Sequence, residues 1–82
     1  MTEFFKTITR KSYEILLIAY FGQEKANRIK KSLNWEALLK DDWRAFLQEK
    51  NANPGYTEND YLDLIWEADI YGILDLYTLK TV

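Results

Sequence analysis

Only one proline and three glycines interrupt the 82 residues of this chain, and that scarcity limits the folds open to it more than any other feature. A strand-rich fold of this size needs many turns, which depend on glycine and proline. Strict apolar–polar alternation is hard to find, whereas apolar residues recur three and four positions apart. We therefore predict an all-α fold, a single domain over residues 1–82 built as a small bundle of about four helices.

The first half of the chain contains two predicted helices separated by a glycine. The first covers Glu3–Phe21 and the second covers Gln23–Leu33, with Gly22 at a position where a left-handed cap favours glycine. The segment Ile15–Phe21 is apolar nearly all round, which is typical of a helix buried by several neighbours. We therefore expect that segment at the centre of the bundle.

The third predicted helix, Trp35–Lys50, has the strongest amphipathic pattern. Its apolar stripe is broken by one carboxylate, Asp42, which lies beside Trp43. A position at the edge of the stripe is the simpler interpretation. The alternative is a buried carboxylate that accepts hydrogen bonds from a Lys, Tyr or Trp side chain, because burial without a partner is costly.

A turn rich in asparagine, proline and glycine, Asn51–Gly55, precedes the last predicted helix. Thr57 and Asp60 have the spacing of a capping box, in which each residue caps the backbone of the other. The fourth helix is predicted over Glu58–Tyr77, with Gly72 as a position where it kinks or ends. The alternative for residues 73–82 is a short extended segment.

Composition excludes several classes of function. The chain has no cysteine and no histidine, so it lacks disulfides, thiolate ligands and the commonest general base and transition-metal ligand. No phosphate loop or calcium-loop spacing occurs, and we predict no enzymatic activity, no cofactor and no metal site. The longest apolar run is too short to span a bilayer, and no cleavage site follows it, so we expect a cytoplasmic protein without membrane contact.

Charge is distributed unevenly along the chain. Residues 1–50 carry ten Lys/Arg and seven Asp/Glu, whereas residues 51–82 carry one Lys and six Asp/Glu. The basic half allows an alternative function, contact with nucleic-acid phosphates. The carboxylates on the polar face of Trp35–Lys50 argue against that helix as a reader of base edges. The residues proposed for this alternative are Arg10, Lys11, Lys25, Arg28, Lys30 and Lys31.

The acidic half interleaves carboxylates with large aromatic residues. Asp60, Asp63 and Glu67 share one helix face at three- and four-residue spacing, where like charges repel. A basic partner would relieve that repulsion, and tyrosine and tryptophan are enriched at binding hot spots. We therefore predict a non-enzymatic module that binds a protein with a basic surface. The residues predicted to contact it are Tyr56, Asp60, Tyr61, Asp63, Trp66, Glu67 and Tyr71.

In size and style the chain resembles small acidic inhibitors, such as nuclease immunity proteins and phage-encoded inhibitors of host defence. The similarity is one of type, since it covers no motif and assigns no residue. The expected function is therefore that of a small inhibitor or immunity-type protein. A second alternative is a structural homodimer or assembly component, because the predicted last helix is apolar around most of its circumference.

Overall fold

A computed structural model describes residues 2–79 of the chain, and five helices account for most of them. In chain order they are α1 (Glu3–Phe21), α2 (Gln23–Ser32), α3 (Trp35–Ala52), α4 (Glu58–Trp66) and α5 (Ile70–Tyr77). The all-α class is confirmed, although the bundle has five helices in the described part rather than about four. The predicted bounds of α1 are confirmed, and α2 and α3 end within two residues of the predicted positions.

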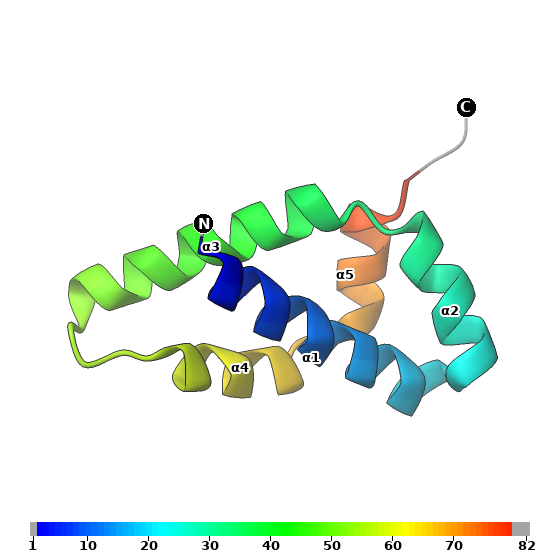
Figure 1. The fold of residues 1–82 in the computed structure, drawn as a ribbon, viewed down its shortest axis with the longest axis horizontal. Helices are drawn as coiled ribbons and strands as arrows, with labels where there is room; N and C mark the ends of the chain where they lie inside the picture. Colours follow the sequence, from blue (N-terminus) through cyan, green and yellow to red (C-terminus); the bar gives the residue numbers. More distant parts are fainter. Residues whose placement is uncertain (1, 80–82) are drawn as a thin grey trace.

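Helix α1 lies across the molecule and contacts α2, α3 and α4, as Figure 1 shows. Helices α3 and α4 run along the two long edges, and α2 and α5 lie at one end. Most of the buried hydrophobic residues form one cluster, which includes Phe5, a residue with no exposed surface. Its ring centroid lies 5.0 Å from that of Trp43, 5.2 Å from that of Phe46 and 5.7 Å from that of Tyr61. These aromatic contacts join α1 to both long edges.

Local capping explains where the helices begin. Thr2 accepts a hydrogen bond from the Phe5 amide at 3.2 Å, and Asn34 accepts one from the Ala37 amide at 3.2 Å. Gly22 joins α1 directly to α2 and has a φ of 83°, a left-handed conformation that strains any residue with a β-carbon. Helices α1 and α3 therefore each begin after a residue whose side chain caps the first turn, whereas α2 begins after a glycine that has no side chain to cap it.

The predicted capping box of α4 is confirmed. The Asp60 amide donates to the Thr57 hydroxyl at 3.3 Å, and the Thr57 amide donates to the Asp60 carboxylate at 2.9 Å. The turn before it is closed by Asn53, whose side chain accepts from the Gly55 amide at 3.1 Å. Asp60 therefore stabilises the start of its own helix, a role that needs no binding partner.

The prediction of one helix over Glu58–Tyr77 is wrong, because the chain breaks between α4 and α5. Asp69, which lies inside the predicted helix, is the N-cap of α5 and accepts a hydrogen bond from the Tyr71 amide at 3.1 Å. Gly72 lies inside α5 rather than at its end, and a β-carbon there would come within 3.1 Å of the Asp69 carboxylate. The absence of a side chain at Gly72 therefore gives the cap its room.

The expectation that Ile15–Phe21 occupies the centre of the bundle is also wrong. Leu16 and Leu17 are buried, but Ile15, Ile18 and Tyr20 are exposed. Four of the six buried residues of α1 lie in its first two-thirds, namely Phe5, Thr9, Ser12 and Tyr13, and Leu16 and Leu17 are the other two. One face of this apolar segment is therefore left open.

The last described residues are pinned to the α2–α3 connection. The Asn34 amide donates to the Tyr77 carbonyl at 2.7 Å, and the Leu79 amide donates to the Ser32 carbonyl at 2.6 Å. Thr78 and Leu33 form an isolated bridge between them. Residues 73–77 are thus helical, Thr78 is extended, Leu79 is non-helical, and residues 80–82 lie outside the described part.

Candidate functional site

The outward face of α4 carries the predicted row of carboxylates. Asp60, Asp63 and Glu67 are all exposed, and Leu64, whose side chain is 49% exposed, lies on the same face by its spacing. We call these four residues the acidic α4 face. Both ion pairs within residues 2–79 involve Glu14 of α1, so no lysine or arginine of the described chain neutralises this face.

The three carboxylates of this face differ in what they do for the fold. Asp60 is used by the capping box. Asp63 makes no side-chain hydrogen bond and no ion pair within residues 2–79. Glu67 is the C-terminal cap of α4, at the end of the helix where the partial charge is negative and a carboxylate is disfavoured. Folding therefore accounts for Asp60 but gives no reason for Asp63 or Glu67.

The predicted aromatic contacts are divided between the surface and the core. Trp66 and Tyr71 are 47% and 60% exposed, so both are free to touch a partner. Tyr61 is 8% exposed and lies in the core. Tyr56 is half-buried, with its ring centroid 5.8 Å from that of Phe46. The structure therefore places Tyr61 and Tyr56 among the residues that build the domain, and leaves Trp66 and Tyr71 at its surface.

Tyr71 belongs to an aromatic cluster that the sequence pattern does not predict. Its ring packs edge-on against Tyr20 and Phe21 at the end of α1, with centroids 6.2 Å and 5.7 Å away. The half-exposed Tyr20 adds its own surface to the cluster. The only sequence signal was the apolar run Ile15–Phe21, which was interpreted as core.

Asp42 is the carboxylate within the α3 stripe for which the sequence allows two positions, at the edge of the stripe or buried with a hydrogen-bond donor. The hydroxyls of Tyr13 and Tyr61 donate to its two carboxylate oxygens at 2.6 Å and 2.7 Å. Burial raises the pKa of Asp42 above its ordinary value, and the two tyrosine hydrogen bonds oppose that rise. Of the two predicted alternatives for Asp42, the structure therefore shows the partly buried carboxylate that accepts hydrogen bonds, and the donors are tyrosines.

The same network holds the tyrosines in their protonated form. Burial, with the neighbouring Asp42 charge, raises the pKa of Tyr13 and of Tyr61 well above 10. Tyr77 donates to the adjacent carboxylate of Asp41 at 2.6 Å, and this hydrogen bond raises the pKa of Tyr77 to about 12. These contacts tie α1, α4 and α5 to one turn of α3.

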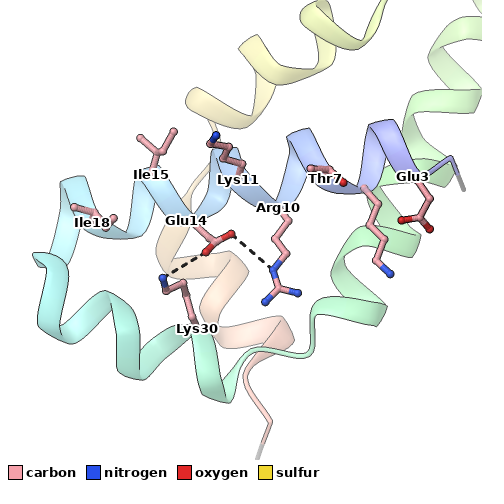
Figure 2. A pocket seen from close by; sticks show the side chains of 9 residues that line it. Glu3, Thr7, Arg10, Lys11, Glu14, Ile15, Ile18 and Lys30 are labelled. Atoms are coloured by element: carbon pink, nitrogen blue, oxygen red, sulfur yellow. Dashed lines mark ion pairs between the residues drawn. The ribbon is translucent and has the colours of Figure 1, made fainter.

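A groove on the outer side of α1 contains part of the alternative nucleic-acid site (Figure 2). It has a volume of about 500 Å³. Arg10 and Lys30 converge in it on Glu14, at 3.7 Å and 3.4 Å. Arg10 also lies 4.7 Å from the ring of Trp35. The lining residues are Glu3, Lys6, Thr7, Arg10, Lys11, Glu14, Ile15, Ile18 and Lys30.

The remaining predicted cations lie outside this groove. Lys25 is placed over the ring of Phe21 at 5.2 Å, and Arg28 and Lys31 are exposed on α2. The groove itself includes two carboxylates, and one of them is shared by Arg10 and Lys30. Three of the six cations therefore line the groove and three do not, and Arg10 and Lys30 are already paired with Glu14.

No family model, characterised protein or solved structure matches this chain. Within the described residues, no three acidic side chains come together in a way that would hold a metal ion. None of the described helices has the length and apolar character needed to cross a bilayer.

Proposed function

We propose that this protein is a binding module that recognises a basic protein surface through the acidic α4 face, with Trp66 and Tyr71 as aromatic contacts beside it. The observation that carries the proposal is the pair Asp63 and Glu67. Both are exposed, neither has a partner within residues 2–79, and Glu67 opposes the helix dipole. Binding to a cationic partner would explain why the helix carries carboxylates that weaken it.

The electrostatics of this face suit fast and selective association. Residues 51–79 contain six carboxylates and no lysine or arginine, so their field has one sign. Such a field steers a basic partner and raises its association rate, and salt screens the effect. The half-exposed Trp66 would then supply contact area, because tryptophan dominates many binding hot spots. A small inhibitor or immunity-type protein works in this way.

The test compares two variants of equal charge. Asp63→Lys/Glu67→Lys reverses the acidic α4 face, and Glu24→Lys/Glu36→Lys makes the same charge change in the first turns of α2 and α3. A photo-crosslinker at position 66, used in the source cells, identifies the partner. Its dissociation constant is then measured for the wild type and for both variants.

We expect the α4 variant to lose partner binding by at least about tenfold while its stability is kept or raised, because a lysine at a helix C-terminus is favourable. The control variant should bind normally although it loses acidic residues from two helix N-termini. Equal binding by the wild type and the α4 variant would refute the proposal. A wild-type chain that runs as a dimer in light scattering, and as a monomer after Asp63→Lys/Glu67→Lys, would point to a second copy as the partner instead.

A further inference from the structure

A groove of about 410 Å³ lies between α3 on one side and the α4–α5 pair on the other. Its walls are mainly aliphatic, and two residues at its mouth are strongly exposed: Leu64 at 49% and Leu76 at 78%. The lining residues are Tyr13, Leu38, Asp42, Ala45, Gln48, Glu49, Tyr61, Leu64, Ile65, Ala68, Ile73, Leu76 and Tyr77.

Within residues 2–79, the charge in this groove has a single sign. Asp42 and Glu49 are the only charged residues of that range that line it, and none of its lysines or arginines does. Asp42 receives hydrogen bonds only from the neutral hydroxyls of Tyr13 and Tyr61, and no cation lies within 4.0 Å of it in the described chain. A half-buried carboxylate in aliphatic surroundings therefore has hydrogen bonds but no counter-charge, a costly arrangement for an ion.

The groove is continuous with the acidic α4 face. Leu64 belongs to both, since it shares a helix face with Asp60 and Glu67 and also stands at the groove mouth. A basic chain that lies along α4 would therefore have the groove within reach of its side chains. Lysine and arginine join an aliphatic stem to a charged end, which suits aliphatic walls with a carboxylate inside.

We propose that this groove receives one lysine or arginine side chain of the basic partner, with its aliphatic stem against Leu64 and Leu76 and its cationic end near Asp42. This inference rests on the proposed function, because it names the anchor of the same partner. Tyr13 and Tyr61 hold the carboxylate in place, and each oxygen keeps a lone pair for the incoming cation. Glu49 adds a second negative charge to the groove lining.

The test uses a small mimic of such a side chain, hexylammonium chloride, with 1-hexanol and hexanoate as neutral and anionic controls. Binding is followed through the tyrosine ring resonances in NMR titrations. Asp42→Asn removes the charge but keeps a hydrogen-bonding group of the same shape. Asp41→Asn is the matched control, since Asp41 neighbours it in sequence, also accepts from a tyrosine, and does not line the groove.

We expect hexylammonium to shift the Tyr13 and Tyr61 resonances and to bind at least about tenfold more tightly than either control compound. Asp42→Asn should remove that preference, and Asp41→Asn should change it less than about twofold. A second variant, Ala45→Leu, narrows the groove and leaves Asp42 in place. It should therefore weaken the binding of hexylammonium without altering the charge of Asp42. Denaturant unfolding of each variant shows that it is folded.

The outcomes separate this inference from the function on which it rests. If hexylammonium shows no preference over hexanol, or if Asp42→Asn leaves the preference intact, the groove site is refuted although partner binding through the acidic α4 face still stands. If Asp63→Lys/Glu67→Lys binds the partner normally, the proposed function fails whatever the groove binds. The inference also requires Asp42→Asn to weaken binding of the purified partner by about tenfold. Asp41→Asn should leave that binding unchanged.

Discussion

The hydrogen bond from Tyr13 to Asp42 permits a quantitative prediction about stability. Tyr13 is 3% exposed, and Tyr13→Phe removes only the hydroxyl and keeps the ring, so the core loses little volume. A hydrogen bond to a charged group contributes about 1.5–3 kcal/mol, so we expect Tyr13→Phe to lower the free energy of unfolding by about 2 kcal/mol at pH 7. Tyr20→Phe, at a 52% exposed position without a side-chain hydrogen bond in the described chain, is the control and should stay within about 0.5 kcal/mol.

The difference between Tyr13→Phe and the wild type should shrink in alkali. The pKa of Tyr13 is raised above 10 in the folded protein, so its stabilisation is fully present below pH 10 and is lost as the pH rises from 10 towards the folded value. At pH 11 ionisation of the unfolded chain at Tyr13 removes about 1.4 kcal/mol from the wild type and nothing from Tyr13→Phe. The difference of about 2 kcal/mol should therefore fall below about 1 kcal/mol.

Urea unfolding followed by circular dichroism at pH 7 and at pH 11 measures both effects. If Tyr13→Phe unfolds at the same urea concentration as the wild type at pH 7, the Tyr13–Asp42 hydrogen bond does not stabilise the fold. If the difference is the same at both values of pH, Tyr13 ionises as easily in the folded protein as in the unfolded chain, which would contradict its burial beside Asp42.

Three further changes test the fold and its polar network by the free energy of unfolding. Gly22→Ala should cost about 1–2 kcal/mol because φ is 83° there, whereas Gly55→Ala, with no positive φ, should cost less; equal losses would contradict the left-handed junction. Thr57→Ala should cost about 1 kcal/mol by removing one half of the capping box, and an unchanged melting curve would show that α4 does not need the cap. The pKa of Asp42 is raised in the folded protein, whereas that of most carboxylates is lowered. Its contribution to stability is therefore present below pH 3.8 and is lost as the pH rises through its higher pKa in the folded protein. Asp42→Asn should therefore gain stability relative to the wild type between about pH 4 and neutrality, and a constant difference over that range would show that the pKa of Asp42 is not raised.

The local part of this fold was readable from the sequence, because its signals are local. Gly22 and the Thr57–Asp60 box each act over four residues or fewer, the α3 stripe repeats every three or four residues, and the structure confirms each of them. The break at Asp69 was missed because an aspartate between two apolar residues resembles a helix edge as much as an N-cap. Only its hydrogen bond to the Tyr71 amide distinguishes the two.

The hydrogen bonds from Tyr13 and Tyr61 to Asp42 could not be predicted from a local sequence pattern, for a different reason. The donors are 29 and 19 residues away in the chain, so no helical spacing relates them. The sequence predicted the row of carboxylates on α4 and the capping role of Asp60, but it did not show that α4 ends with Glu67 as its C-terminal cap. Tertiary packing likewise decided that Tyr61 is buried and that Trp66 is not.

The most direct test of the proposed function is NMR mapping of the chain with its crosslinked partner in purified form. We predict that backbone and side-chain shifts concentrate on Asp63, Trp66, Glu67 and Tyr71, with the shift of the Trp66 indole N–H among the largest. Shifts confined to the outer side of α1 and to α2, around Arg10 and Lys30, would contradict it and would place the binding surface on the basic half of the molecule.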